Sequence, residues 1–387
     1  IEKAITNPKA NVKEKTWRYR GMIYNNVAMD TALSSLYPDA LVNAISSYQT
    51  ARSLDVKGRY ADDHDKGLNL TRVIANELAM NAWGVENYEG SAGFFKNAID
   101  AAVANEVVDS TAMSNYALAL EKNQMFAESA EAYLKCARIG FNQVQSFLAA
   151  TDAAVSANNR PLAFQIIAEA KEYSPGDQGI LITEFNLFVE EQSLVDEEIE
   201  LHKQAQDVKG SGDEESSREF ELLIDSLERK KETLFEAALT SIMSAANNDS
   251  TNAALWVQSG IILGELGLRD ESISALSQAI SADSMLFDAH YMLGTTYYND
   301  AAKIDEAIRE KYDAIFRLTK SQQADKDRMK DEMSSLFQLA LPSFMKSYEI
   351  NPKDCDTLAA LQTIYGRLGN TTKEEAIYAE RKVVGCR

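Results

Sequence analysis

Large and small side chains follow a pattern along this chain that recurs every 34 residues. It is clearest from Ala253 to Leu286, and Phe287 begins it again. Positions 4, 11 and 24 of each period carry large residues, whereas positions 8, 20 and 27 carry small ones. Spacings of three, four and seven put such residues along one side of a helix, where small residues let two helices approach closely and large ones fill the gaps. The pattern therefore predicts a repeated unit of two packed helices.

Eight units of this kind can be aligned along the chain. Their predicted starts are Glu14, Arg72, Ser110, Val144, Gln178, Ala253, Phe287 and Cys355. Position 24 is apolar or aromatic in all eight, and position 20 is small in all except the last unit, which has Glu374. A polar outer face is what the terminal unit of a stack needs. We therefore expect an all-α solenoid of about eight helix–turn–helix units that forms a single domain over residues 1–387.

The period is interrupted in the fifth unit, where 41 extra residues separate the two helices. Apolar and near-apolar residues recur in steps of three and four on both sides of the polar segment 209–213. Such spacing is that of a heptad seam between two helices. It predicts an antiparallel helical arm over residues 190–232, a segment with fifteen acidic and six basic side chains.

A second insertion, of 34 residues, lies in the seventh unit and predicts another helical arm over residues 300–338. An extended helix is indicated there by the spacing of Ile304, Ile308, Tyr312, Ile315 and Leu318. Residues 320–325 are the expected tip. Long insertions in repeat arrays gather on one face and often carry function. The sequence leaves open whether each arm binds a partner or is a tolerated insertion.

The 34-residue unit resembles the tetratricopeptide repeat (TPR), over most of the chain. More narrowly, residues 15–21 (KTWRYRG), 293–299 (LGTTYYN) and 349–354 (EINPKD) resemble a group of exported bacterial TPR proteins. This resemblance implies a right-handed superhelical α-solenoid, located in the periplasm or at the periphery of the outer membrane, and no particular biochemical role. Because the sequence begins at Ile1 within a helical pattern, we expect a processed chain whose signal peptide has been removed.

Composition narrows the range of partners. The formal net charge is −20, which argues against nucleic acid because phosphate binding needs clustered Lys and Arg. It leaves cationic proteins as partners, or a charge that only keeps an extended surface soluble. No stretch approaches the roughly 18 to 20 apolar residues of a membrane span, so none is expected in this chain.

Residues suited to catalysis are sparse. The three histidines, His64, His202 and His290, lie far apart in the sequence, and no metalloprotease, nucleophile-elbow or phosphate-loop motif occurs. The acidic run at residues 62–67 superficially suggests a calcium loop, but Lys66 occupies a ligand position and Val73 stands where a closing Glu is required. We therefore expect no enzyme activity, no metal and no cofactor.

The resemblance to TPR proteins also identifies a candidate binding groove. In that family the first helix of each unit forms the inner wall, mainly through positions 2, 5, 9, 12 and 13. The candidate residues are Arg18, Met22, Asn25, Asn26, Asn76, Met80, Trp83, Tyr291, Tyr298 and Asn299. Trp83 and Tyr298 are the foremost candidates, and the alternative is that inserted residues cover them. The Lys and Asn pair by which some TPR proteins clamp a C-terminal carboxylate is missing, since positions 5 and 9 of the first unit are Arg18 and Met22.

The three cysteines have different expected roles. Cys136 occupies position 27 and should be a buried small apolar residue. Cys355 begins the first helix of the last unit and Cys386 follows its second helix, so the two are neighbours in a helical hairpin. If the protein is exported, we expect a disulfide between them. The alternative is an inert Cys355 and a frayed terminus.

Together these features predict a non-catalytic scaffold or adaptor of the bacterial cell envelope that binds a protein or peptide in its concave groove. Two alternatives remain open. One is a surface glycan-binding lipoprotein, a class that is longer and carries irregular insertions. The other is a structural part of an outer-membrane assembly or secretion complex.

Overall fold

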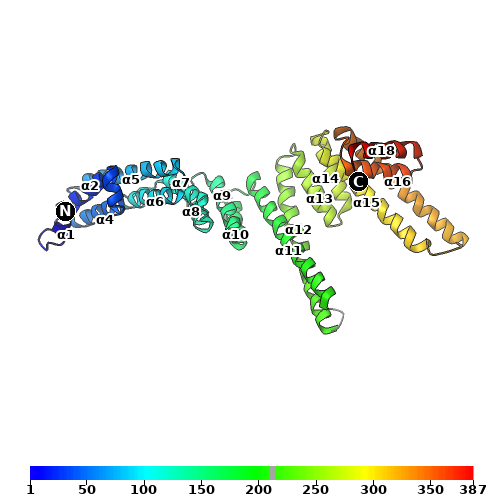
Figure 1. Cartoon of the computed structure of the whole chain (residues 1–387), viewed down its shortest axis with the longest axis horizontal. Helices are drawn as coiled ribbons and strands as arrows, with labels where there is room; N and C mark the ends of the chain where they lie inside the picture. The colour runs from blue at the N-terminus through cyan, green and yellow to red at the C-terminus, as the bar shows by residue number, and fades with distance from the viewer. Residues whose placement is uncertain (210–213, 387) are drawn as a thin grey trace. The chain divides into compact units, whose positions relative to one another are not determined.

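The computed structural model describes residues 1–209 and 214–386, and all regular secondary structure in these ranges is helical. The chain divides into two compact units, Ile1–Pro175 and Gly176–Arg387 (Figure 1). This boundary falls inside the array that the sequence predicts to be continuous. Each unit is described separately below.

The first unit contains ten helices, most of which pack as neighbouring pairs. They are α1 (Glu2–Ile5), α2 (Glu14–Met29), α3 (Thr31–Leu36), α4 (Ala40–Leu54), α5 (Ala61–Gly84), α6 (Tyr88–Ala104), α7 (Ser110–Lys122), α8 (Phe126–Arg138), α9 (Gln143–Ser156) and α10 (Arg160–Tyr173). The helical pairs are α2 with α4, α5 with α6, α7 with α8, and α9 with α10.

In its described residues, the second unit contains eight helices that pack in the same way. They are α11 (Gln178–Lys209), α12 (Glu214–Asn248), α13 (Ala253–Glu265), α14 (Arg269–Ala282), α15 (Phe287–Tyr312), α16 (Lys320–Ile350), α17 (Cys355–Arg367) and α18 (Thr371–Val384). Consecutive helices again form the pairs, beginning with α11 and α12 and ending with α17 and α18.

Seven of the eight predicted unit starts lie within one residue of the first residue of a helix, and the start at Arg72 does not. Helix α5 begins eleven residues earlier, at Ala61. The additional turns are anchored because His64, Leu68 and Thr71 are buried within the first unit. The 34-residue template places the unit correctly but does not include this N-terminal extension.

Glycines at position 8 of three units show why the pattern needs small residues there. A Cβ added to Gly21 would lie 2.7 Å from the ring of Tyr48 on α4. One added to Gly260 would meet Leu276, and one added to Gly294 would meet Phe344, both also closer than 3.0 Å. The large residue at position 24 of the second helix therefore fills the space that the glycine leaves on the first helix.

Serines at position 20 connect the two helices of a pair by hydrogen bonds. The hydroxyls of Ser91 and Ser129 each donate to the backbone carbonyl at position 8 of their own unit, over 2.9 Å, and that of Ser272 donates to the carbonyl of Gly260 over 2.7 Å. All three serines are buried. The bond satisfies a hydroxyl that would otherwise be costly to bury, and it fixes the axial register of the two helices.

The first arm is formed by the far ends of α11 and α12. Its seam contains Val195, Ile199 and Leu227, with Ile224 and Leu234 packed against them. Ion pairs flank the seam, from Lys230 to Glu191 over 3.0 Å and from Lys203 to Glu228 over 3.6 Å. The expected polar tip at residues 209–213 lies almost wholly outside the described residues.

The second arm is formed by the far ends of α15 and α16, and its tip differs from the expected one. Helix α15 ends at Tyr312, so Ile315 lies in the connecting loop and not on an extended helix. Helix α16 already begins at Lys320, where the predicted tip was to start. The reason is a capping box, in which Thr319 and Gln322 satisfy each other's backbone amides and start the helix at that point.

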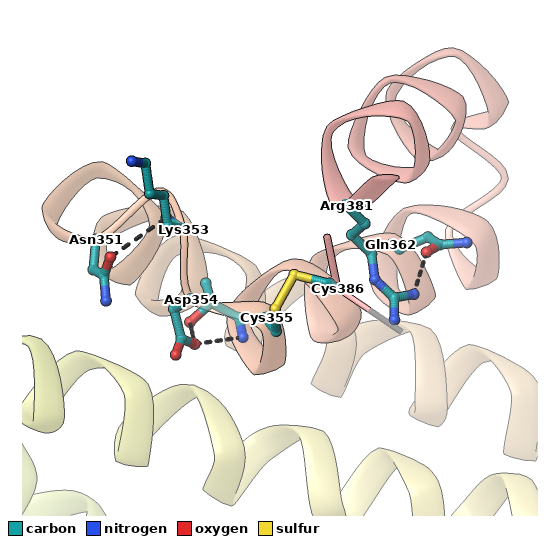
Figure 2. The surroundings of a disulfide bond; sticks show 8 residues. Asn351, Lys353, Asp354, Cys355, Gln362, Arg381 and Cys386 are labelled. Carbon is teal, nitrogen blue, oxygen red and sulfur yellow. Dashed lines mark hydrogen bonds between the residues drawn. A yellow bond between two sulfur atoms is a disulfide. The ribbon is translucent and has the colours of Figure 1, made fainter. Parts of the chain in front are cut away.

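The last pair of helices closes the second unit. Helix α18 has no fully buried residue, and few side chains hold it against its neighbours. Tyr348 of α16 donates to Glu380 over 2.7 Å, and Arg381 donates to Gln362 over 2.6 Å. Cys355 and Cys386 form a disulfide with a Cα–Cα distance of 5.4 Å, which joins the beginning of α17 to the residues after α18 (Figure 2).

Candidate partner-binding surfaces

The first candidate surface is built on α2 and α5, which pack side by side. Gly21 of α2 and Gly67 of α5 both face the ring of Tyr48, which lies beneath the two helices. Tyr48 is fully buried, and burial raises the pKa of its hydroxyl to about 12. Because both glycines face this ring, the side chains on the opposite sides of α2 and α5 point away from the core.

A network of charged groups fixes the N-terminal ends of these two helices. The guanidinium group of Arg18 binds Glu14 over 2.7 Å and Asp63 over 3.1 Å, and it lies over the ring of Tyr60. Nε2 of the fully buried His64 lies 2.9 Å from the same Glu14 carboxylate. Arg18 therefore joins α2 to α5, and its donors are largely occupied within the unit.

Asn25 was expected in the groove, and this prediction is wrong. Its side chain is 1% exposed. The amide donates to the carbonyl of Gly67 over 3.1 Å and accepts from the hydroxyl of Thr71 over 2.8 Å. These bonds satisfy a polar group buried between α2 and α5, so Asn25 positions the helices and has no access to a partner.

Between these buried contacts and solvent lies an exposed apolar surface, which we call the α2–α5 face. Its members recur at helical spacing on each helix and are more than a third exposed. They are Tyr19, Met22, Ile23 and Met29 of α2 and Leu70, Val73 and Met80 of α5. Asn26 is also exposed among them. Met22 and Met80, which the sequence predicted, belong to this face, and the other five members were not singled out.

Asn76 and Trp83 lie on α5 but are only partly exposed. The amide of Asn76 donates to Asp109 over 3.3 Å, and Arg72 binds the same carboxylate over 2.7 Å. Burial opposes ionisation of Asp109, but the bonds from the Ala112 amide and Arg72 outweigh it and lower its pKa below the ordinary value. Asn76 thus helps to hold the beginning of α7 against α5, and less of it is accessible to a partner than the sequence suggested.

Trp83 packs edge-on against Tyr88, with 5.0 Å between the ring centroids. The contact joins the end of α5 to the beginning of α6, across the turn within one helical pair. One part of the indole remains accessible, at the C-terminal end of the helix that carries Met80. Trp83 can therefore border the α2–α5 face, but its ring is partly used in packing.

In the second unit, the two candidate tyrosines belong largely to the core. Tyr291 stacks on Phe287 and meets Phe344 edge-on, and burial raises the pKa of its hydroxyl. Tyr298 meets Phe337 and Phe344 edge-on, with centroid distances of 5.6 and 6.1 Å. Phe344 is the position-24 residue of the unit's own second helix, whereas Phe337 lies in the second insertion. An inserted residue therefore covers part of Tyr298, which is the alternative that the sequence left open.

Asn299 is exposed and lines a cavity of about 200 Å³ between α13, α14 and α15. The walls include the backbone at Gly264 and the side chains of Thr295 and Lys303. An ion pair between Arg269 and Asp300 closes one side. The cavity has the size for one side chain of a bound segment, and it combines hydrogen-bonding groups with the small apolar surface that a glycine leaves.

Across residues 1–209 and 214–386, no three His, Cys, Asp or Glu side chains come together as a metal site. Within the same ranges, no helix is long and apolar enough to cross a membrane. What the surfaces offer is contact area and hydrogen bonds for another molecule.

The contacts inside the repeats identify the fold. A small residue at position 8, a serine that binds its carbonyl from position 20, and a large ring or aliphatic chain at position 24 recur in successive helical pairs. The fold is of the tetratricopeptide repeat type. The fold class that the sequence predicted, an all-α array of helical pairs, is confirmed.

Known proteins resemble this chain in structure and not in sequence. No protein-family profile matches the chain, and no curated protein matches its sequence. Similar solved structures include YrrB, described as a TPR protein with an unusual peptide-binding site, at 15% identity over 56% of this chain and 89% of that chain, with a TM-score of 0.34. The TPR repeats protein BF2334 from Bacteroides fragilis is 12% identical over 76% of this chain and 98% of its own, with a TM-score of 0.35. A human IFIT1 dimer with m7Gppp-AAAA is 13% identical over 94% of this chain and 74% of its own, with a TM-score of 0.32.

Proposed function

We propose that this TPR-type chain is a non-catalytic scaffold that binds a protein or peptide segment on the α2–α5 face. The observation that carries the proposal is the exposure of seven large apolar side chains on two adjacent helices. Isolated apolar residues on a surface are ordinary, but several large ones on two packed helices are typical of an interaction site. The two helices are held by buried bonds of Asn25, so the face exists before a partner arrives.

The chemistry of the face favours a segment with apolar side chains. Three of its seven members are methionines, whose flexible and polarisable side chains adapt to ligands of different shape. The exposed amide of Asn26 offers a donor and an acceptor to the backbone of a bound peptide. This composition suits an amphipathic helix or an extended segment laid across the two helices. It suits a glycan less well, because sugar hydroxyls need many hydrogen-bonding partners and the face has few.

Absence of catalysis and location in the cell envelope are parts of the same proposal. Among the candidate residues, Arg18, Asn76 and Tyr298 are engaged in ion pairs, hydrogen bonds or packing, and a binding role needs no further chemistry. The disulfide between Cys355 and Cys386 supports an oxidising compartment such as the periplasm, because thiols stay reduced in the cytosol. The net charge of −20 supports a protein partner over nucleic acid. The alternative role, as a structural subunit of an outer-membrane assembly, would use the same face. Identifying the partner distinguishes that role from the role of an adaptor.

A peptide library displayed on phage tests the proposal. We expect the purified chain to enrich peptides with spaced apolar residues, and the double substitution Met22→Glu/Met80→Glu to weaken their binding by about tenfold or more, because two contacts of the face would be replaced by charges. The matched control is Val56→Glu, at a residue that is also highly exposed but lies outside the face. Affinities are measured by isothermal titration calorimetry, and melting curves confirm that all variants fold.

Two results would contradict the proposal. One is enrichment of no peptide by the wild-type chain. The other is equal binding by the wild type and the Met22→Glu/Met80→Glu variant, which would move the binding surface elsewhere. The cavity beside Asn299 is then the next surface to test, by filling it with Thr295→Trp.

A further inference from the structure

The tip of the second arm presents a large apolar side chain entirely to solvent. Phe316 is 106% exposed, and its neighbour Ile315 is 37% exposed. Both lie in the loop that joins α15 to α16, at the far end of the arm (Figure 1). An aromatic ring without any contact inside its own protein contributes nothing to folding, so this ring requires another explanation.

The loop is held at both of its ends, so the exposure of Phe316 does not result from a frayed turn. Tyr312, the last residue of α15, is buried, and its hydroxyl donates to Asp325 over 2.5 Å. Lys311 binds the same carboxylate over 2.8 Å, and Arg328 does so over 2.9 Å. On the other side, the capping box of Thr319 fixes the first turn of α16. The seven residues between the helices are thereby presented in a defined position.

The charge at the tip is opposite to that of the whole chain. Between Asp313 and Asp325 the sequence contains two basic residues, Arg317 and Lys320, and no acidic one. Both side chains are exposed, and neither forms an ion pair within the described part of the chain. The chain as a whole carries a net charge of −20. The tip is therefore a small basic and apolar surface on a strongly acidic protein.

The arm also separates this tip from the acidic body of the unit. An ion pair over 2.7 Å joins Arg367, the last residue of α17, to Asp305 of α15. Helix α15 continues from there to Tyr312, which at 1.5 Å per residue is about 10 Å. That distance is about one Debye length at physiological salt, so the negative charge of the body is largely screened at the tip.

We propose that the tip of the second arm binds to the surface of an anionic lipid bilayer. The side chains of Phe316 and Ile315 enter the boundary between headgroups and acyl chains, while Arg317 and Lys320 contact lipid phosphates. Aromatic and aliphatic residues flanked by cations are the composition of interfacial membrane contacts. A protein partner is less suitable, because a stable protein interface buries about 800 Å² on each side and this tip is far smaller.

This contact is peripheral and reversible. A single loop with two apolar residues binds a membrane weakly, and it gains strength from anionic lipids and loses it at high salt. It would orient the second unit at a membrane without anchoring it. The lipid contact does not depend on the α2–α5 face, which lies in the other unit, so each can fail separately.

Vesicle flotation tests the lipid contact with the full chain. The vesicles are made of phosphatidylcholine alone or of phosphatidylcholine and phosphatidylglycerol in equal parts. We expect the wild type to float with the anionic vesicles only. Phe316→Asp and Arg317→Glu/Lys320→Glu should each reduce the bound fraction by about tenfold, because the first removes the ring that enters the boundary and the second reverses the charges that contact lipid phosphates. Val56→Asp, at an equally exposed apolar residue of the first unit, is the control and should float like the wild type.

The outcomes that overturn the lipid contact are equally definite. Failure of the wild type to float with anionic vesicles at low salt excludes it and leaves a pocket on another protein as the binding site for Phe316. Undiminished flotation of Phe316→Asp would show that another surface binds the vesicles. Misfolding does not confuse the result, because Phe316 makes no contact in the fold and the melting curves of its variants should match that of the wild type.

Discussion

The two arms of the second unit are built by the same device and present different surfaces. In both, the helices of a repeat continue past the array and pack against each other. The first arm buries Val195 and Leu227 in a seam between flanking ion pairs, and its outer surface is acidic. The second arm ends in a loop that displays Phe316 beside basic residues. Lengthening a helical pair therefore does not define a function, and the exposed residues of each arm have to be examined separately.

The arms also differ in how they connect to the core. Phe337 of the second arm is buried in a cluster that includes Phe344 of the same helix and Leu361 and Tyr365 of α17. The apolar cluster of the first arm, around Ile199, is separate from the cluster at the base of α11 and α12. The second arm should therefore unfold together with its unit, whereas the first should be able to open alone.

The largest expected difference between the two arms is in the effect of truncating one buried side chain in each, by Phe337→Ala in the second arm and Leu227→Ala in the first. We expect Phe337→Ala to lower the free energy of unfolding of the second unit by about 3 to 5 kcal/mol, because it leaves a cavity in the shared cluster. Leu227→Ala should leave that free energy nearly unchanged and raise amide exchange only in the first arm. Denaturant unfolding and hydrogen exchange measure the two effects. Equal global destabilisation by both variants would show that the arms are coupled to the core alike.

The disulfide of the last helical pair gives the next largest effect. It closes a sequence separation of 31 residues around α17 and α18, and α18 has no fully buried residue of its own. Replacing both cysteines by serine should lower the free energy of opening this hairpin by about 3 to 4 kcal/mol, on the loop-entropy relation. Hydrogen exchange at α18 measures the change. Mass spectrometry of the non-reduced protein provides the control, and two free thiols there would contradict the disulfide.

The charges at the tip of the second arm predict a dependence on pH. Bonds from Lys311, Tyr312 and Arg328 hold the pKa of Asp325 well below its usual range. A lowered pKa means that Asp325 stabilises the folded tip at every pH above the ordinary value of about 3.9, and that this stabilisation is lost as the pH falls toward the folded pKa. Carbon-detected NMR of the Asp325 carboxyl group should therefore show it still mostly ionised at about pH 3, where an aspartate with the ordinary pKa is mostly protonated. If Asp325 instead becomes protonated near the ordinary aspartate pKa, the hydrogen bonds from Lys311, Tyr312 and Arg328 do not form in solution.

The smallest effect is expected in the seam of the first arm. Lys231 occupies a seam position and binds Asp196 over 2.6 Å, but both side chains are partly exposed. Exposed ion pairs contribute about 0 to 1 kcal/mol, so Lys231→Met should change the stability of the arm by less than about 1 kcal/mol. Hydrogen exchange in α12 measures it. A large loss of protection would show that charge, and not the apolar seam, holds the first arm together.

Much of the fold could be predicted because the repeat is defined by contacts between neighbouring positions. Gly260 and Leu276 meet within one unit at the spacing of the template, so that spacing is itself the structural constraint. Gly294 and Phe344 make the same contact although the second insertion lies between them. The early start of α5 could not be found in this way, since its extra turns lie outside the template. The loop at the end of the second arm was misplaced although Thr319 and Gln322 form a readable capping pattern.

The binding surface was harder to predict than the fold. The positions of the inner wall include Met22 and Met80, and both side chains are exposed. The same positions include Asn25, which is buried. A helical position that borders a neighbouring helix can be buried or exposed, and sequence spacing does not distinguish the two cases. Tyr298 shows the same difficulty. Phe337 and Phe344 of α16 pack against it, and because the insertion lies between them and Tyr298 in the sequence, the repeat spacing does not reveal these contacts.

The central claim, that the α2–α5 face binds a protein segment, is tested most directly by NMR of methionine methyl groups. The chain has 11 methionines, and three of them, Met22, Met29 and Met80, belong to the face. On addition of a selected peptide, we expect shifts of these three methyl signals and none at the buried Met333 or at Met345 on α16. Shifts confined to Met345 or other methionines outside the face, with Met22 and Met80 unchanged, would contradict it.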